Sequence, residues 1–419
     1  MSDVRQASSA DRRTPVMRRT RAGLGFAVIP LLGIITPLLV LPVLTSRFGE
    51  PAWVAVAVGQ SIGAGFVTIG EMGWGLSGPQ RVARQAPTSA LSLSILSIQT
   101  RLVVLGPLAL VTVCAALLIS PTNGVWAASV ALATLLTSLS LSWMFLGQTR
   151  PWLVVTFEAF PRLIGLAIAA GLMLVGFDFW VYPVVGLGIP AIVAVVLSLA
   201  HVRRQTSQKA RIWKARQVRL AIRSQWSAVL TRSSSALYIA LPVSLVSIVS
   251  PDSVAVFAAG ERILRICLGG LIALPNAMQG WVGSASQAND RRQRVRKSIG
   301  WGIAMGLVGG VLFAFLAPTA SSVLFSGVAT IPPSTAAVFG TTLAIVCISR
   351  ITGGIGLVAS RQVNRLAQSA LLGALVGVPA ILVLALFFGA VGGAAGELAA
   401  EAAVLSFQWL SLKKYLRTT

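Results

Sequence analysis

The stretch HVRRQTSQKARIWKARQVRLAIR, residues 201–223, divides this chain into two apolar halves. It carries eight basic side chains and no acidic one, and long apolar runs lie on both sides of it. Such a segment cannot lie in hydrocarbon, and next to an anionic inner leaflet each Lys or Arg is stabilised by about 1 kcal/mol. We therefore predict a basic cytoplasmic linker over 201–224, either a short amphipathic helix in the interface that uses Trp213 and Ile222, or a solvated loop.

The composition on either side of the linker is that of a membrane protein. Of 419 residues, 55% are hydrophobic and only 11% are charged, compared with about 45–50% and about 25% in soluble domains. The net charge of +23 would by itself suggest nucleic acid, but the basic residues lie in short breaks between apolar runs. There they orient membrane helices. We therefore expect an all-α polytopic membrane protein without a nucleic-acid partner.

Cysteine and histidine give no sign of a metal centre. Cys114, Cys267 and Cys347 stand alone within apolar runs, and His201 is the single histidine. Neither a disulfide framework nor a metal cluster follows from this pattern. We expect no metal, no cofactor and no catalytic residue.

Twelve apolar runs have about the 17–25 residues that a transmembrane helix needs. The first is long enough to span, so no cleaved signal peptide is expected. The chain then divides into a basic cytoplasmic tail (1–22), a six-helix bundle (23–200), the linker (201–224), a second six-helix bundle (225–412) and a cytoplasmic tail (413–419). The runs are Leu24–Leu44, Trp53–Trp74, Leu102–Ser120, Val125–Leu146, Leu153–Gly176, Phe179–Leu199, Trp226–Val249, Ser253–Val282, Ile299–Leu316, Ser334–Val358, Leu366–Phe388 and Val391–Leu410.

The distribution of charge agrees with this count. With both termini in the cytoplasm, the cytoplasmic segments hold 28 of the 34 basic residues, including Arg81, Arg84 and Arg101 in the second loop. The outer breaks contain only Arg47. Basic residues on one side are the usual determinant of membrane orientation.

A short internal sequence repeat, which we call the sequence echo, relates the two halves. Leu41-Pro42-Val43, Pro51 and Val54-Ala55-Val56 recur 200 residues later as Leu241-Pro242-Val243, Pro251 and Val254-Ala255-Val256. Six helices followed by six, each set beginning in the cytoplasm, describe a parallel pseudo-two-fold repeat about an axis normal to the membrane. A binding site between the halves would follow.

Several stretches resemble the polysaccharide (O-antigen type) flippases, which belong to the superfamily of the MATE drug exporters and lipid II flippases. They touch most of the chain in the expected order, and none is an active-site signature. One departure concerns the end of the eighth run, where such proteins often have Pro-Arg and residues 280–287 read GWVGSASQ. The stretches are LPVLTSRFGEPAWVAVAVGQ (41–60), GWGLSGPQRVAR (73–84), FLGQTRPWLVVTFEAFPRL (145–163), VAVFAAGERILR (254–265), LVASRQVNR (357–365) and GAVGGAAGELAAEAAVL (389–405).

The resemblance implies two bundles around a central cavity that opens alternately to either side of a bacterial cytoplasmic membrane. The implied cargo is a polyprenyl-pyrophosphate-linked oligosaccharide, moved from the inner to the outer leaflet for cell-surface polysaccharide biosynthesis. Membrane lipids, and contact with the polysaccharide polymerase machinery, are the further partners it suggests.

Charges inside the apolar runs are the candidates for function, because a charge at the bilayer centre costs at least about 2.5–3.5 kcal/mol. Guanidinium groups stay charged and bind phosphate oxygens in pairs. We expect Arg232, Arg262 and Arg265 to bind the pyrophosphate first, with Arg162 and Arg350 as further candidates. Internal ion pairing is the alternative, because Glu158 and Arg162, like Glu261 and Arg265, are four residues apart with the acid first.

Acidic residues suggest an energy source. Glu397 and Glu401 are four residues apart in the twelfth run. Two carboxylates on one face, away from water, favour a bound proton or a shared cation. Coupling to H⁺ or Na⁺ through this pair is one hypothesis, pairing with an arginine is the other, and Glu71 is a further candidate.

Two rival functions are weighed against the flippase. A MATE-like exporter of cationic drugs, driven by proton or sodium antiport, would bind its cargo through acids. A membrane polysaccharide polymerase would need acids or a large outer loop for its chemistry. The arginines in the seventh and eighth runs and the short outer breaks favour a carrier of anions over both.

Overall fold

The computed structural model describes residues 15–84, 90–121, 123–206, 212–271 and 273–417. Within these ranges some side chains are not described, namely those of 15–27, 30, 31, 34, 37, 227, 228, 230–238, 273, 277, 414 and 417. Every regular element in this part of the chain is a helix. The α-helices are α1 (Pro15–Gly70), α2 (Trp74–Arg84), α3 (Ala90–Ile119), α4 (Gly124–Leu136), α5 (Ser142–Gly147), α6 (Pro151–Val154), α7 (Phe160–Val175), α8 (Ile189–Arg204), α9 (Ala215–Ala240), α10 (Pro242–Val249), α11 (Val254–Leu271), α12 (Ala273–Gly283), α13 (Ala288–Leu324), α14 (Pro333–Ile351) and α15 (Val363–Arg417).

Short 3₁₀ or π-helical turns connect several of these helices. The 3₁₀ turns are η2 (Thr137–Leu139) and η5 (Pro251–Ser253). The π-helical turns are η3 (Val155–Ala159), η4 (Tyr182–Gly188) and η6 (Thr352–Leu357). Turns of this kind often lie at functional sites.

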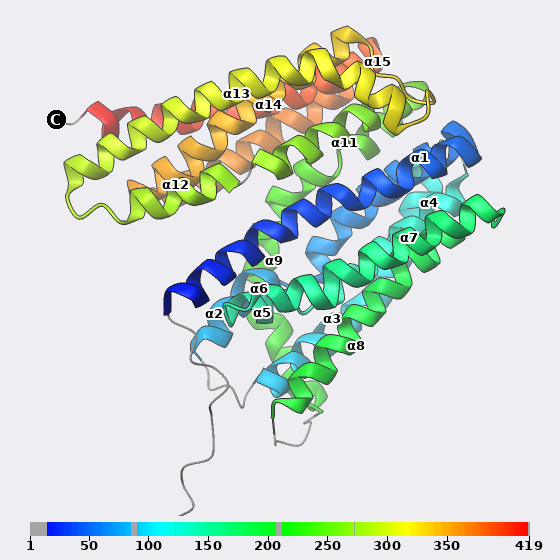
Figure 1. The fold of residues 1–419 in the computed structure, drawn as a ribbon, viewed down its shortest axis with the longest axis horizontal. Helices are drawn as coiled ribbons and strands as arrows, with labels where there is room; N and C mark the ends of the chain where they lie inside the picture. The colour runs from blue at the N-terminus through cyan, green and yellow to red at the C-terminus, as the bar shows by residue number, and fades with distance from the viewer. Residues whose placement is uncertain (1–14, 85–89, 122, 207–211, 272, 418–419) are drawn as a thin grey trace, which may run out of the picture.

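Helices α1 and α15 each reverse direction at a glycine. Gly49 has a φ of 69° and Gly389 a φ of 58°, in the left-handed region that side chains disfavour. A straight helix with the 56 residues of α1 would be about 84 Å long, far more than the roughly 30 Å of a hydrocarbon core. Figure 1 shows each long helix folded into a hairpin instead.

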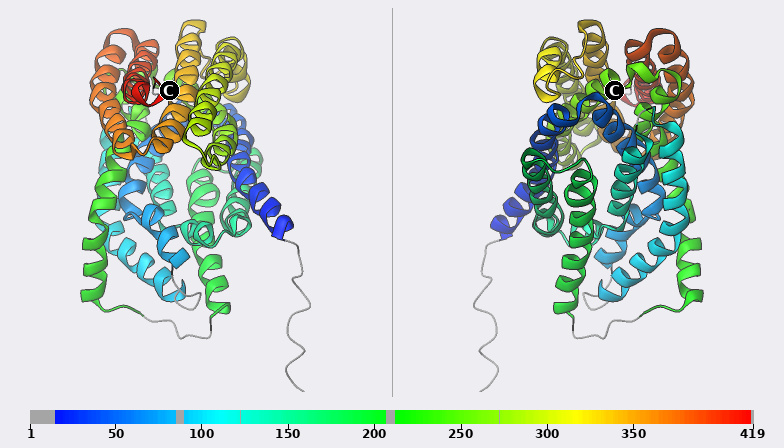
Figure 2. Two further views of the ribbon diagram at one scale, coloured as in Figure 1. Left: turned by 90° about the vertical axis from the view of Figure 1, so that its left-hand side faces the viewer. Right: turned by 90° about the vertical axis from the view of Figure 1, so that its right-hand side faces the viewer.

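The hairpins take part in two groups of helices, which we call the N lobe (α1–α8) and the C lobe (α10–α15). In the N lobe α1 packs on α3, α4 and α7, and in the C lobe α14 packs on α13 and α15. Helix α9 contacts both lobes, through α1 and α3 on one side and α15 on the other. Figure 2 shows the C lobe gathered above the N lobe in both views.

The two ends of the molecule differ in how the lobes are packed. The beginning of α1 and the end of α15 lie at one end, the terminal side, where the ribbons of the lobes diverge (Figure 1). There each lobe has its own apolar core, around Trp74 and Phe145 in the N lobe and around Ile351 and Leu412 in the C lobe. At the opposite end, the far side, a single core includes residues from both lobes.

Polar contacts reinforce the closure between the lobes toward the far side. Trp53 Nε1 donates a hydrogen bond to the Ala255 carbonyl oxygen (2.9 Å), and the Trp53 ring packs on Phe325. Ser244 Oγ donates to Ser61 Oγ (2.8 Å). Trp53 and Ala255 lie in or beside the two copies of the sequence echo, which therefore meet across the interface.

Eight helices in the described part of the chain are long and apolar enough to cross a membrane. The predicted count of twelve is therefore not confirmed, and the pseudo-repeat and the orientation of the termini stay predictions. One of the eight candidates, Val363–Lys413, contains the Gly389 reversal and so includes the last two predicted runs. Helix α9 is not among the eight because its polar residues make it insufficiently apolar, and α11 carries three charged residues, Glu261, Arg262 and Arg265.

One assignment in the predicted cytoplasmic loops is wrong. Arg101 lies within α3, and its side chain is only 1% exposed. Helix α3 begins at Ala90, well before the predicted run at Leu102, so Arg101 falls inside the N lobe.

Candidate ligand-binding cavities

A cavity of about 340 Å³ lies between the lobes. Its walls come from α1, α4 and α7 of the N lobe, from α10 and α11 of the C lobe, and from α9. We call it the inter-lobe cavity. Its charged lining residues are Arg162, Arg262, Arg265 and Glu261, and its polar ones include Gln60, Ser61 and Thr134.

Three of the five arginines predicted to bind cargo meet in this cavity. Arg162 comes from α7, whereas Arg262 and Arg265 come from α11 in the other lobe. Arg162 and Arg262 are close enough to repel each other. The buried Arg262 Nε has no hydrogen-bond partner among the described residues. With one glutamate against three arginines, the described lining carries a surplus of two positive charges, which an anionic ligand would neutralise.

Gln60 lines the inter-lobe cavity and is held by a buried tyrosine that is not part of the described lining. Gln60 Nε2 donates a hydrogen bond to the Tyr182 hydroxyl (2.8 Å). Tyr182 is 1% exposed, and it begins the π-helical turn η4. No charge or spacing in the sequence singled out this pair.

Arg265 is held by groups from three helices. Its Nε donates to Glu261 Oε1 (2.7 Å), so the ion pair expected from their spacing is formed. Its Nη2 donates to the Ile239 carbonyl oxygen on α9 (2.5 Å) and lies 3.9 Å from Glu397 Oε1 on α15. Glu397 therefore has an arginine as its partner. Pairing with an arginine was one of the two hypotheses for Glu397 and Glu401, the other being coupling to a cation.

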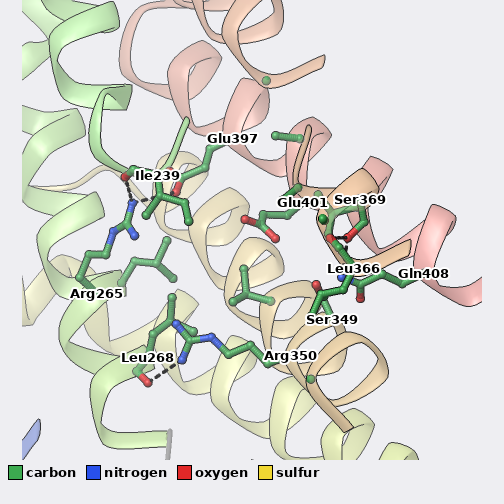
Figure 3. Close-up of a pocket in the computed structure, with 18 of the residues that line it drawn as sticks. Ile239, Arg265, Leu268, Ser349, Arg350, Leu366, Ser369, Glu397, Glu401 and Gln408 are labelled. Carbon is green, nitrogen blue, oxygen red and sulfur yellow. Dashed lines mark hydrogen bonds and ion pairs between the residues drawn. The ribbon is translucent and has the colours of Figure 1, made fainter. Parts of the chain in front are cut away.

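A second and larger cavity, about 500 Å³, lies within the C lobe. It is lined by Arg265 and Arg350, by Glu397 and Glu401, and by polar side chains that include Gln408. Figure 3 shows both carboxylates on one side of this space and Arg350 below them. Arg350 Nη1 donates a hydrogen bond to the Leu268 carbonyl oxygen (3.1 Å). Arg350 lines the C-lobe cavity and is absent from the described lining of the inter-lobe cavity.

Both acids of the predicted ion-coupling pair thus share one cavity. The buried Glu397 Oε2 has no hydrogen-bond partner in the described structure. Arg265 lines this cavity as well as the inter-lobe cavity. It is therefore a side chain that borders both spaces.

A third cavity, about 270 Å³, lies in the N lobe and contains Glu158 and Arg162. The expected ion pair between these two is not formed among the described side chains, since Glu158 Oε1 instead accepts a hydrogen bond from Ser140 Oγ (2.6 Å). The physical reason is the π-helical turn η3, Val155–Ala159. Such a turn has an i→i+5 pattern, which changes the angular relation that four-residue spacing gives on an α-helix.

Arg101 is the cation that attracts Glu158 from a longer distance, without a direct ion pair between the two described side chains. Arg101 Nη1 donates to the Ser140 carbonyl oxygen (2.7 Å), and Arg101 attracts both Glu158 and Glu71. Glu71 therefore belongs to an N-lobe network and does not line the C-lobe cavity. Arg101 is the charged residue that sequence reasoning missed, because its position suggested a loop.

The remaining predicted cargo residue lies on α9. The side chain of Arg232 is outside the described residues, so its role stays a prediction. Among the described residues no group of three or more His, Cys, Asp or Glu side chains is arranged to hold a metal ion.

This architecture is shared with membrane transporters. Neither protein-family models nor curated proteins gave a match to the sequence. Among solved structures, an inward-facing multidrug resistance MATE family transporter of the MOP superfamily has a TM-score of 0.69 at 13% identity, with 94% of this chain and 98% of that chain covered. The chain thus has the fold of MOP-superfamily transporters.

Two further solved structures sharpen the comparison. The lipid II flippase MurJ, in an inward closed conformation, matches with a TM-score of 0.68 at 13% identity, covering 95% of this chain and 89% of that chain. An outward-facing MATE family transporter of the MOP superfamily matches with 0.56 at 14% identity, covering 97% and 98%. The arrangement of the lobes therefore resembles the two inward conformations more than the outward-facing one.

Proposed function

We propose that this protein is an alternating-access flippase that moves a polyprenyl-pyrophosphate-linked oligosaccharide from the inner to the outer leaflet. The observation that supports this most directly is the convergence of Arg162, Arg262 and Arg265 from both lobes on one cavity. A pyrophosphate is the part of such a cargo that needs compensating charge. Guanidinium groups supply it with paired hydrogen bonds, and they remain protonated.

The placement of the arginines suits a cargo that must be carried between two states. Arg162 lies on one lobe and Arg262 on the other, so an anion between them would be held by both lobes at once. With the anion bound, the repulsion between these arginines is replaced by attraction to a common ligand. The glycan would extend toward the terminal side, where the lobes diverge, and the prenyl chain would remain in lipid.

The distribution of basic residues supports one orientation of the protein in the membrane. We place the terminal side in the cytoplasm, because basic segments accumulate there. The closed far side then faces outward, in keeping with the similarity to inward conformations. In this state the inter-lobe cavity would receive cargo from the inner leaflet.

Coupling to a proton or sodium ion belongs to the same proposal. Glu397 and Glu401 line one cavity within the C lobe, next to Arg265. A monovalent cation there would neutralise carboxylates that otherwise lie far from water. Glu71, which interacts with Arg101, is the weaker coupling candidate.

The test is to delete the gene in its host and to restore it with single variants. Loss of the protein should cause lipid-linked oligosaccharide to accumulate on the inner leaflet, and Arg162→Ala or Arg262→Ala should fail to relieve this accumulation while the protein still inserts. Arg47→Ala, on the far side, is the matched control and should restore export. Accumulation of unpolymerised repeats already on the outer leaflet would instead indicate a polymerase.

Export of organic cations is the alternative, and one observation favours it. The larger C-lobe cavity contains two carboxylates, which would suit a cationic drug better than an anionic headgroup. Two of the structures compared are also MATE transporters. If this alternative held, host cells without the protein would become sensitive to cationic drugs and Glu397→Gln would not restore resistance.

A further inference from the structure

Arg265 contacts groups in both the inter-lobe cavity and the C-lobe cavity. These contacts indicate whether a ligand in one cavity strengthens or weakens binding in the other. The guanidinium of Arg265 lies at the border, with Glu261 on its own helix and Glu397 across the boundary on α15. The side chain is 35% exposed, so it is accessible to a ligand. The distance to Glu261 is 2.7 Å, whereas the distance to Glu397 is 3.9 Å. The second contact is the looser one.

The positive charge of Arg265 is compensated by several acidic residues together. The acids facing it are Glu261 from α11 and Glu397 and Glu401 from α15. Arg350, from α14, lines the C-lobe cavity beside the two acids of α15, and Arg262, on α11, lines the inter-lobe cavity. Toward α9, the one described contact of Arg265 is the hydrogen bond that it donates to the Ile239 carbonyl oxygen. A change in charge at Glu397 therefore alters the field at Arg265 directly.

We propose that Arg265 is a shared counter-ion, so that binding of a monovalent cation at Glu397 strengthens the binding of a phosphorylated anion in the inter-lobe cavity. This inference rests on the proposed function, since it assumes that the anion binds there. When Glu397 is ionised it attracts Arg265 and repels the anion. When a proton or sodium ion neutralises Glu397, both effects weaken, and Arg265, still bonded to Glu261, contributes a stronger positive field to the inter-lobe cavity.

The proposed linkage between cation and anion binding is positive, which distinguishes it from cation–cargo exchange. In a simple exchanger the cation and the cargo compete for one site, so that one weakens the other. Here they bind at neighbouring sites of opposite charge, and by thermodynamic reciprocity each strengthens the other. Cation and anionic headgroup would then occupy the protein together.

The test measures binding of inorganic pyrophosphate to the purified full-length protein at one fixed pH, where the charge of the probe is constant. Glu397→Gln, which mimics the neutralised carboxylate, should bind about tenfold more tightly than the wild type, within the roughly 5–150-fold range of such couplings. In an Arg265→Ala background the same substitution should give little gain. Glu50→Gln, the same substitution at an exposed far-side position, should leave the affinity unchanged.

Two further binding experiments identify the cation. Replacing choline chloride by sodium chloride at constant ionic strength should tighten pyrophosphate binding to the wild type but not to Glu397→Gln if sodium is the ligand. If the ligand is a proton, lowering the pH should tighten binding of sulfate, whose charge is constant near neutrality, with the same dependence on Glu397. An equal response of wild type and Glu397→Gln to both cations would overturn the proposal.

The possible outcomes distinguish a failure of the proposed linkage from a failure of the proposed flippase function. If Arg262→Ala binds pyrophosphate as well as the wild type does, the inter-lobe cavity is not an anion site and the proposed function fails. If Arg262→Ala weakens binding but Glu397→Gln weakens it too or has no effect, only the linkage fails. Should Glu397→Gln not purify as a folded protein, Glu401→Gln neutralises the other acid of α15 that faces Arg265, and it should tighten binding in the wild-type background but not in the Arg265→Ala background.

Discussion

Trp53 Nε1 and the carbonyl oxygen of Ala255 are 2.9 Å apart and join the two lobes by a hydrogen bond. The indole is 2% exposed, and it packs on Phe325 with ring centroids 4.5 Å apart. The bond is therefore buried between the lobes, at the edge of the inter-lobe cavity that Trp53 also lines. Opening the far side would require this bond to break and the indole to leave its contacts.

Trp53→Phe should favour opening of the far side, because it keeps an aromatic ring but removes the donor. The lost hydrogen bond contributes about 0.5–1.5 kcal/mol, so the open population should increase roughly two- to tenfold. Spin labels at Glu50 and Thr330, exposed on opposite lobes, would report this as a larger long-distance fraction. Trp126→Phe, at a tryptophan that stacks on Phe179 within the N lobe, is the control, and an equal change there would contradict the assignment.

Arg101→Ala should destabilise the N lobe strongly. The substitution removes the positive charge that attracts Glu158 and leaves the Ser140 carbonyl oxygen without its donor, and an unsatisfied buried group of this kind costs about 1–3 kcal/mol. The apparent midpoint of thermal unfolding in detergent measures the loss. Arg101→Ala combined with Glu158→Gln should recover part of it, and a double variant less stable than Arg101→Ala alone would show that the two charges do not compensate each other.

Gly389→Ala should weaken the reversal in α15. Its φ of 58° is unfavourable for alanine, and the added Cβ would lie 2.5 Å from Ser253 Oγ. We expect a loss of more than about 1 kcal/mol, read from the same unfolding midpoint. Gly106→Ala is the matched control, because no described atom lies within 4 Å of the place its methyl group would take and helix propensity favours alanine by up to about 1 kcal/mol. Equal destabilisation by Gly389→Ala and Gly106→Ala would contradict the view that Gly389 is needed for the reversal.

Gln60→Glu should weaken binding of pyrophosphate by the inter-lobe cavity. The substitution places a carboxylate among the three arginines and lowers the positive surplus there. We expect roughly a tenfold loss, equivalent to about 1.4 kcal/mol, measured by titration calorimetry. Gln60→Met keeps the size and loses the hydrogen bond to Tyr182, so it should have the smaller effect, and an equal loss in both variants would show that charge is not the cause.

The sequence predicted well those features that depend on local spacing. Apolar runs predicted membrane helices, and these are present as helices in the described chain. The four-residue spacing of Glu261 and Arg265 predicted an ion pair that the structure contains. The same reasoning failed for Glu158 and Arg162, because the π-helical turn η3 alters the geometry on which the rule depends.

The amino-acid sequence by itself determined that this is a helical membrane protein with arginines and glutamates inside its apolar runs, because hydrophobicity and charge are properties of each residue. Only the tertiary structure decided which of those charges meet. Arg265 and Glu397 are 132 positions apart, Arg162 and Arg262 are 100 apart, and Arg101 became buried through the packing of α3. Such encounters depend on where helices reverse and how they cross, and these are set by many side-chain contacts together.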